Sequence, residues 1–420
     1  MGKTHLMRGV GRMADLVMTK AQGSWVYTAD QRKLLDFTSG IAVTSLGHCH
    51  PRVVEATQRQ VATLVHAQVN LGYHAPMLEL SDRLLPKLPQ GLDSLFFSTT
   101  GSEAVENAVK LARHATKKPN VIVFQGGYHG RTLGAVSLTT SKTIYRAGYG
   151  PLMSGVTVVP FPYPTHGPIF EKESCGQWCL DQIKLALKQQ TAPSETAAVL
   201  IEPVLGEGGY VVPPKSFMKG LRKICDDNNM LLIADEVQSG YGRTGEFFAI
   251  DGHFDVVPDV LVMAKGIANG FPLSAIASRK ELSDSQPPGS VGGTYAGNAV
   301  SCAAALATLD VIEEENVLAN VNKRGAEFMA GLQKLKASGR YPIQDVRGLG
   351  LMVALEFDLK LAPVGTAARV SEACLKHGMM VLTTSTFETL RFMPPLTISA
   401  DETRLGLELL ERALEDTFSK

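Results

Sequence analysis

Two short apolar runs, each closed by a single charged residue, constrain this chain more than any other feature. Residues 231–234 (LLIA) are followed by Asp235, and residues 260–264 (VLVMA) are followed by Lys265. Apolar runs of this length bounded by turn signals are typical of buried strands in a parallel sheet. In open α/β sheets, ligands bind just beyond the carboxyl ends of such strands. The pattern therefore predicts an α/β fold that delivers an acid and an amine to one crevice.

Each charge alone has an ordinary explanation. A lysine after a strand is usually a solvated loop charge, and an aspartate there is more often a helix cap. The pair is more specific, because Gln238 follows the acid and Gly266 follows the lysine. An acid facing a pyridinium nitrogen and a lysine forming a Schiff base are what pyridoxal phosphate (PLP) requires of a protein. We therefore expect PLP as the cofactor.

The surrounding sequence supports this expectation. IADEVQSGYGRTGEFFA and PDVLVMAKGIANGFPLSA resemble the signature of class III (ω-amino) aminotransferases, which are PLP enzymes of fold type I. The resemblance implies a large domain with a mostly parallel central sheet and a small α/β domain made from both chain ends. It also implies that Lys265 carries the cofactor, that Asp235 pairs with its pyridinium nitrogen, and that Gln238 binds near the ring hydroxyl.

A candidate phosphate site follows a short strand that ends near Phe97. The sequence TTGSEAVENA opens a helix, and Thr100 and Glu103 have the spacing of a capping box. Free backbone N–H groups and the helix dipole make such an N-terminus an anion site. Plain helix capping is the alternative. The resemblance favours a phosphate role for Gly101 and Ser102.

A second motif, GGYHGRT, follows the predicted strand at residues 121–124. An aromatic ring just past a strand end can stack on a pyridine face, which the resemblance assigns to Tyr128. His129 is placed with it among the cofactor-binding residues. Arg131 offers a planar fork to a substrate carboxylate, and a surface salt bridge is the alternative role.

The resemblance implies five further site residues. Ile41 would form an apolar wall over the substrate chain, with an ordinary core position as the alternative. Thr294 would reach the PLP phosphate of a partner subunit. Glu202 is assigned to the substrate site. Glu207, on a glycine-rich loop, would neutralise Arg391 while an ω-amine is bound and swing aside for a 2-oxo diacid. A fixed salt bridge or two unrelated surface charges are the alternatives.

Composition excludes several other classes of protein. The 420 residues carry a formal net charge of zero, which gives no indication of nucleic acid or an anionic membrane as partner. No apolar run reaches the length of a membrane span. His48 and His50 lack further ligands, so no metal site is expected. The six scattered cysteines suggest reduced thiols in the cytoplasm, and the basic N-terminus leaves mitochondria as an alternative.

We predict three segments: residues 1–50 as the N-terminal part of the small domain, 51–315 as the large PLP-binding domain, and 316–420 as the C-terminal small domain. Strands are predicted within 23–37 and at 198–201, 273–278 and 346–357. Helices are predicted at 52–66, 316–338, 365–377 and 401–417. Residues 160–195, which begin with three prolines and a glycine within FPYPTHGPIF, are expected to form an insertion loop.

The predicted reaction is transfer of an amino group from a small-molecule ω-amine to a 2-oxo acid. The stretches TTGSEAVENA, GIAV and LRFMPPLT look most like those of 4-aminobutyrate aminotransferases. The resemblance implies 4-aminobutyrate as donor and 2-oxoglutarate as acceptor, with a semialdehyde and glutamate as products. An acetylornithine or ornithine aminotransferase, or a PLP-dependent isomerase or decarboxylase on the same fold, are the alternatives. A homodimer or a dimer of dimers is expected.

Overall fold

A computed structural model describes residues 2–384 and 386–418, which are built around one seven-stranded sheet. Its strand order is β4-β10-β9-β8-β7-β5-β6. The strands are β4 (Ser94–Ser98), β5 (Asn120–Phe124), β6 (Val156–Val159), β7 (Thr196–Ile201), β8 (Leu231–Asp235), β9 (Val260–Met263) and β10 (Ser274–Ser278). All neighbouring pairs from β9 to β6 are parallel, and β10 runs antiparallel to both of its neighbours. The expected mostly parallel α/β sheet is confirmed.

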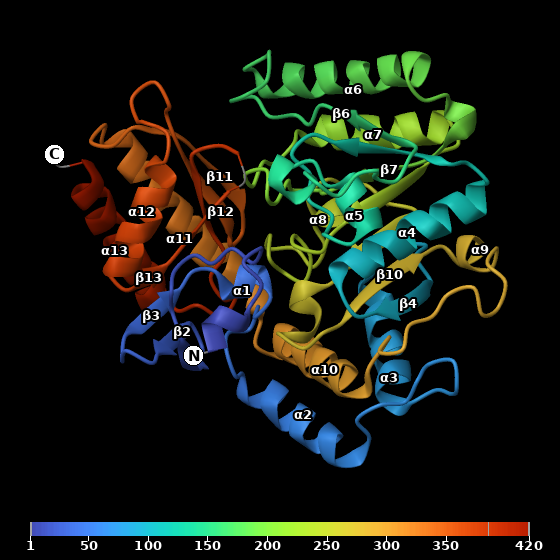
Figure 1. The fold of residues 1–420 in the computed structure, drawn as a ribbon, viewed down its shortest axis with the longest axis horizontal. Helices are drawn as coiled ribbons and strands as arrows, with labels where there is room; N and C mark the ends of the chain where they lie inside the picture. Colours follow the sequence, from blue (N-terminus) through green and yellow to red (C-terminus); the bar gives the residue numbers. More distant parts are fainter. Residues whose placement is uncertain (1, 385, 419–420) are drawn as a thin grey trace.

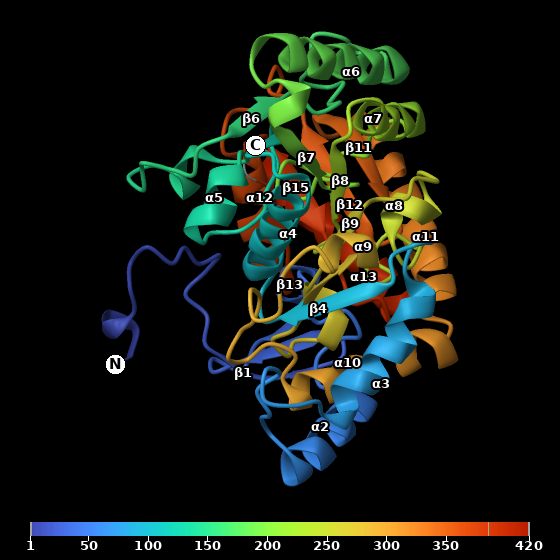
Figure 2. The ribbon, with the colours of Figure 1, turned by 90° about the vertical axis from the view of Figure 1, so that its right-hand side faces the viewer.

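Both faces of this sheet are covered by helices, and successive side chains of one strand point to opposite faces. On β5, Val121 and Val123 join the core beneath α4 (Gly101–Thr116), whereas Ile122 and Phe124 join the core beneath α7 (Lys215–Asp227). Figure 2 shows α4 on one side of the strands and α7 on the other. Burial on both faces explains why these strands read as continuous apolar runs.

Parallel strands place their carboxyl ends at one edge of the sheet. The residues at or just beyond the ends of β5, β7, β8 and β9 therefore converge there, and they include Tyr128, Glu202, Asp235 and Lys265. This edge is where the fold type predicts a ligand.

Two smaller sheets lie to one side of the central sheet in Figure 1. The first, in the order β1-β2-β3-β13, joins strands from both chain ends: β1 (Met18–Gln22), β2 (Trp25–Thr28), β3 (Lys33–Asp36) and β13 (Met379–Met380). The second, in the order β11-β12-β15-β14, comprises β11 (Ile343–Leu349), β12 (Met352–Phe357), β15 (Thr389–Phe392) and β14 (Leu382–Thr383). We propose that these sheets form a small domain from residues 1–50 and 316–420, with 51–315 as the large domain.

The other helices surround these sheets. They are α1 (Ser39–Ala42), α2 (Pro51–Thr63), α3 (Ala75–Leu84), α5 (Leu133–Leu138), α6 (Lys172–Gln189), α8 (Ala249–Gly252), α9 (Lys280–Ser283), α10 (Ala299–Glu314), α11 (Val317–Ala337), α12 (Thr366–Lys376) and α13 (Ala400–Phe418). Short 3₁₀ helices occur at Gly2–His5, Leu85–Lys87, Thr143–Tyr145, Pro193–Glu195 and Lys265–Ala268.

Two predictions about local structure are wrong. Residues 160–195 are not an insertion loop throughout, because α6 spans Lys172–Gln189. Its buried residues Cys175, Cys179 and Ile183 recur at helical spacing, but the prolines before them favoured the prediction of a loop. Residues 346–357 are not one strand, because β11 and β12 form a hairpin whose turn contains Gly350, with a φ of 53°.

The described residues contain neither a membrane-spanning helix nor a cluster of metal-binding side chains. None of the helices in residues 2–384 and 386–418 is both long and apolar enough to cross a bilayer. Within the same ranges, no three or more His, Cys, Asp or Glu side chains are grouped so that they would hold a metal ion.

Candidate active site

A cavity of about 330 Å³ opens where the strands of the central sheet end. It brings together predicted site residues that lie far apart in the sequence. Its lining includes Gly101, Ser102, Tyr128, His129, Glu202, Asp235, Gln238 and Lys265. Eight of the predicted site residues therefore share one space.

Asp235, the last residue of β8, is held on both sides. Its Oδ2 lies 2.7 Å from His129 Nδ1, and its Oδ1 accepts a hydrogen bond of 3.1 Å from the Val237 backbone. Burial disfavours a charged His129, but the hydrogen bond and the charge of Asp235 outweigh it and raise the pKa of His129. The Val237 contact resembles a local cap, yet the cap alternative does not account for the bond to His129.

Glu202 follows β7 and lies beneath the same cavity. Its two oxygens accept hydrogen bonds from the backbone of Tyr128 (2.7 Å) and of Gly206 (2.8 Å). Burial raises its pKa to about 7, while the neighbouring His129 opposes that rise. Glu202 thus ties together the two loops that carry Tyr128 and Glu207.

Lys265 opens the 3₁₀ helix after β9, and its backbone is left-handed with a φ of 46°. Such a conformation is uncommon for a residue other than glycine and is often found at functional sites. Burial lowers the pKa of the amine to about 8; Glu207 raises it and Arg391 lowers it further. The amine lines the cavity, so the alternative of a solvated loop charge is wrong.

The N-terminus of α4 forms one end of the cavity. Thr100 caps the helix by accepting a 3.3 Å hydrogen bond from the Glu103 backbone, and the Glu103 side chain accepts one from the backbone of Thr99. The Ser102 hydroxyl accepts a hydrogen bond from the Arg131 backbone at 3.2 Å. Capping therefore occurs, and it leaves Gly101 and Ser102 on the cavity surface.

Arg131 lies over two aromatic rings. Its guanidinium carbon is 5.6 Å from the ring centroid of Tyr128 and 4.9 Å from that of Tyr145. The two tyrosine rings themselves meet edge to face at 5.4 Å. These contacts aim the Arg131 fork into a second, larger cavity of about 1370 Å³.

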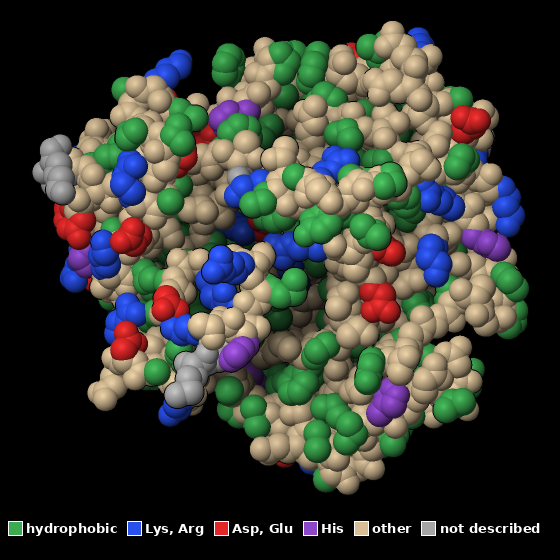
Figure 3. Space-filling model, viewed as in Figure 1, with side chains coloured by type: hydrophobic (Ala, Val, Ile, Leu, Met, Phe, Trp, Pro, Cys, Tyr) green, Lys and Arg blue, Asp and Glu red, His purple; other side chains and the backbone are tan. Residues whose placement is uncertain are grey.

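Glu207 and Arg391 form an ion pair at the wall of the larger cavity. Both side chains are largely buried, with the residues 9% and 4% exposed, so the alternative of two unrelated surface charges is wrong. Burial lowers the pKa of Arg391, but Glu207 outweighs it and raises that pKa. Figure 3 shows Lys and Arg side chains gathered in the central hollow of this face.

Two predicted site residues, Thr294 and Ile41, line neither of these two cavities within a single chain. Thr294 is exposed in the loop before α10. Ile41 is 41% exposed, so its alternative as an ordinary core residue is wrong. It sits in a turn where Ser39, Gly40, Ile41 and Ala42 all have positive φ. A β-branched residue rarely adopts that conformation, so surrounding structure must impose it.

Sequence reasoning missed two residues that the structure brings to the site. The side chain of Val237 contacts the Gly101 position and lines the smaller cavity, while Tyr145 supports Arg131 from a short 3₁₀ helix. Val237 lies two residues after Asp235, within the motif IADEVQSGYGRTGEFFA, so its place in that motif could have identified it. Tyr145 carried no sequence signal, because only tertiary packing brings it to Arg131.

The cavity fits PLP. A helix N-terminus with a hydroxyl suits the phosphate, and an amine whose pKa is lowered suits the aldehyde. Asp235 suits a pyridinium nitrogen. Within the described residues, the buried Gln238 Oε1 has no hydrogen-bond partner, so a polar group of the ligand would satisfy it.

Comparison with known proteins identifies the class. The model of the family "Aminotransferase class-III" matches residues 7–414. The chain therefore belongs to the class III aminotransferases, and it is a PLP-dependent aminotransferase that moves an amino group from an amine donor to an oxo-acid acceptor.

Individual relatives agree over nearly the full length. The chain is 39% identical over 415 residues to the 5-aminovalerate aminotransferase DavT of Pseudomonas aeruginosa, covering 97% of this chain and 96% of the relative. It is 40% identical over 416 residues to the 4-aminobutyrate aminotransferase GabT of Escherichia coli, with the same coverage. A PLP-bound amine transaminase from an uncultivated Pseudomonas species superimposes with a TM-score of 0.90 at 30% identity, covering 98% of each chain.

Proposed function

We propose that this enzyme transfers the amino group of 4-aminobutyrate to 2-oxoglutarate, giving a semialdehyde and glutamate. The observation that carries the proposal is the buried Glu207–Arg391 pair beside Lys265, with Arg131 in the same larger cavity. One arginine is thus neutralised and the other is available, which suits a donor with one carboxylate and an acceptor with two. Similarity to 4-aminobutyrate aminotransferases supports the same donor.

The cofactor would be held by groups that already converge on the smaller cavity. Gly101 and Ser102 would bind its phosphate, and Tyr128 would stack on its ring. Gln238 would form a hydrogen bond on the side of the ring that carries the hydroxyl. When bound, PLP supplies a ring that accepts electrons from the substrate carbon. Asp235, oriented by His129, would keep the ring nitrogen protonated.

Lys265 would carry the protons. Its amine has a pKa of about 8, so near neutral pH it can both accept and return a proton at the reacting carbon. Glu202 would hold the loops that carry Tyr128 and Glu207 in place through two backbone hydrogen bonds. Val237 adds an apolar side chain to the same wall.

The two substrates would be told apart by a switch formed by Glu207 and Arg391. Arg131 would bind the carboxylate that both substrates carry. Arg391 alone would be a costly unpaired charge in a desolvated site when the donor is bound, and Glu207 neutralises it. The second carboxylate of 2-oxoglutarate would displace Glu207 and take its place on Arg391.

A second donor, 5-aminovalerate, is favoured by one observation. A relative at 39% identity carries that activity in its name. The two donors differ by one methylene, which a pocket discriminates only modestly. A half-reaction panel decides between them: the PLP form is mixed with 4-aminobutyrate, 5-aminovalerate or N-acetylornithine, and the absorbance of the bound cofactor is followed. We expect the ratio of the half-reaction rate constant to the dissociation constant to be highest for 4-aminobutyrate. A higher ratio for N-acetylornithine would contradict the proposal.

The same proposal includes a homodimer, or a dimer of dimers, in the cytoplasm. Thr294 is exposed and outside its own chain's smaller cavity, which suits a role in a neighbour's phosphate site. A large exposed apolar set near it, comprising Val61, Leu64, Val65, Leu71, Tyr73 and Tyr295, is suited to burial against a second copy.

A further inference from the structure

Glu207 lies on a closed loop whose ends pair with each other. Leu205 and Val211 exchange two backbone hydrogen bonds, of 3.0 and 3.3 Å. Glu202 anchors the near side of this loop by accepting a hydrogen bond from the Gly206 backbone at 2.8 Å. The far side contains Gly208 and Gly209, which by themselves leave the chain free to move.

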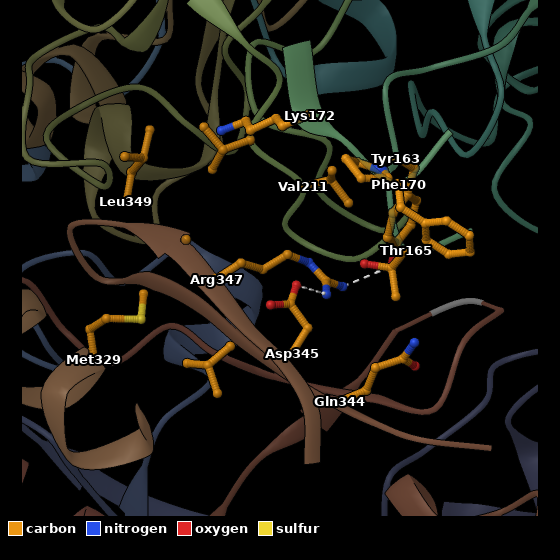
Figure 4. A pocket seen from close by; sticks show the side chains of 14 residues that line it. Tyr163, Thr165, Phe170, Lys172, Val211, Met329, Gln344, Asp345, Arg347 and Leu349 are labelled. Carbon is orange, nitrogen blue, oxygen red and sulfur yellow. Dashed lines mark hydrogen bonds and ion pairs between the residues drawn. The ribbon is translucent and has the colours of Figure 1, made fainter. Parts of the chain in front are cut away.

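Arg347, on β11, anchors that far side. Its Nε donates a 2.9 Å hydrogen bond to the carbonyl oxygen of Gly209. The other two nitrogens of its guanidinium bind Asp345, at 3.0 Å, and the pair formed by Tyr163 and Glu356, each at 2.7 Å. In Figure 4 the Arg347 side chain extends from β11 with Asp345 beside it and Tyr163 beyond. Every nitrogen of a rigid planar fork is thus engaged.

Gly209 suits this close contact between the loop and Arg347. Gly209 has a φ of 132°, and a Cβ there would lie 2.7 Å from the Tyr163 hydroxyl and 2.9 Å from Arg347 Nη2. The chain therefore uses glycine where it brings the loop against the guanidinium.

Strand register links Arg347 to the ion pair. On the sheet β11-β12-β15, Arg347 is opposite Ala354, and Ala354 is opposite Arg391. Residues directly opposite on neighbouring strands point to the same face. Two arginines in one cross-strand row therefore reach the same loop, Arg391 through the Glu207 carboxylate and Arg347 through the Gly209 carbonyl.

We propose that Arg347 is a positioning residue for substrate selection. It fixes the backbone of the Glu207 loop, so that the Glu207 side chain moves while the loop stays in place. Glu207 then returns to Arg391 whenever a monocarboxylate donor is bound. This inference rests on the proposed Glu207–Arg391 switch, and it adds the residue that holds the backbone of the Glu207 loop in place.

Arg347→Lys tests the inference, because an ammonium cannot bind Gly209 and Glu356 in the geometry of the fork. Butyrate and glutarate, which lack the reacting groups, serve as probes of the PLP-loaded enzyme by calorimetry. We expect the ratio of the butyrate to the glutarate dissociation constant to rise about fivefold, the typical effect of one lost hydrogen bond. Hydrogen exchange in the peptide covering 203–213 should also become faster.

Asp345→Asn is the matched control, since it removes a partner of Arg347 without touching Gly209; its ratio should stay at the wild-type value. A purely structural role for Arg347 would weaken both probes equally and leave the ratio unchanged, which would overturn the inference. If the lysine variant does not fold, Arg347→Gln replaces it with the same expected shift.

Glu207→Gln separates this inference from the proposed function. If that variant raises the ratio and Arg347→Lys does not, the switch stands and the positioning role fails. If Glu207→Gln leaves the ratio unchanged, the switch itself fails, and the inference falls with it.

Discussion

His129 Nδ1 lies 2.7 Å from Asp235 Oδ2, and the two side chains are almost entirely buried. The histidine arrives from the loop after β5 and the aspartate ends β8, so the contact links two strand ends of the central sheet. One carboxylate oxygen is thereby committed to His129, and the orientation of Asp235 in the cavity is fixed before any ligand binds. Such an acid is suited to hold one charge state next to a ring nitrogen.

Asp235→Asn should keep the fold and lose most of the activity, because a neutral amide no longer favours a protonated ring nitrogen. We expect the single-turnover rate with 4-aminobutyrate to fall at least about a hundredfold. The matched control is Asp259→Asn. Asp259 is also buried, but it accepts a hydrogen bond from the Leu232 backbone at the opposite ends of the strands. The Asp259→Asn variant should lose stability and retain the rate constant. Near-normal turnover in Asp235→Asn would show that Asp235 only caps the local backbone.

The pH dependence of Lys265 should differ from that of an ordinary lysine. Burial lowers the pKa of its amine to about 8, so in the PLP-free protein the amine is mostly protonated at pH 7 and mostly neutral at pH 9. Pulse acetylation with peptide mass spectrometry should therefore show the reactivity of Lys265 rising through pH 8. A midpoint near the usual lysine value of about 10.4 would contradict the described environment.

Borohydride treatment of the PLP-loaded protein should attach the cofactor to the peptide that contains Lys265. Lys265→Ala should still bind PLP through the phosphate site, since Gly101 and Ser102 are untouched, but it should acquire no covalent label. Label on any other lysine of the wild-type protein would disprove the assignment.

Thr294→Val should weaken PLP binding if the hydroxyl completes a neighbour's phosphate site. One lost hydrogen bond to a charged phosphate corresponds to roughly a tenfold rise in the dissociation constant. Ser290→Ala, in the same loop, is the control and should leave the affinity unchanged. Sedimentation should show at least a dimer, and a fully active monomer would rule out the shared site.

The sequence predicted the parts of this enzyme that depend on local pattern. Apolar runs ending at Asp235 and Lys265 located two strand ends, and the Thr100–Glu103 spacing located the helix N-terminus. Contacts set by tertiary packing were beyond it. No local signal pairs His129 with Asp235, stacks Arg131 on Tyr145, or places Arg347 in register with Arg391.

The helix α6 shows how local pattern can also mislead. Three prolines precede it, and they favoured a loop over the helical spacing of Cys175, Cys179 and Ile183. Gln177, Asp181 and Lys184 lie on the exposed face of this helix. Burial of Cys179 and Ile183 against the core stabilises the helix, and the sequence indicates that buried face only through the spacing of its apolar residues.

The measurement that tests the central claim most directly is the rate of each half-reaction in Arg391→Ala. Because Arg391 would bind only the second carboxylate of the acceptor, the 2-oxoglutarate half-reaction should lose about a hundredfold in rate constant over dissociation constant, the scale of a broken buried charge pair. The double variant Glu207→Gln/Arg391→Ala controls for the carboxylate left unpaired in the single variant. In that background the 4-aminobutyrate half-reaction should stay within about threefold of wild type, below the loss expected for one charge-assisted hydrogen bond. Equal losses in the two half-reactions would contradict the switch and make Glu207–Arg391 a fixed salt bridge.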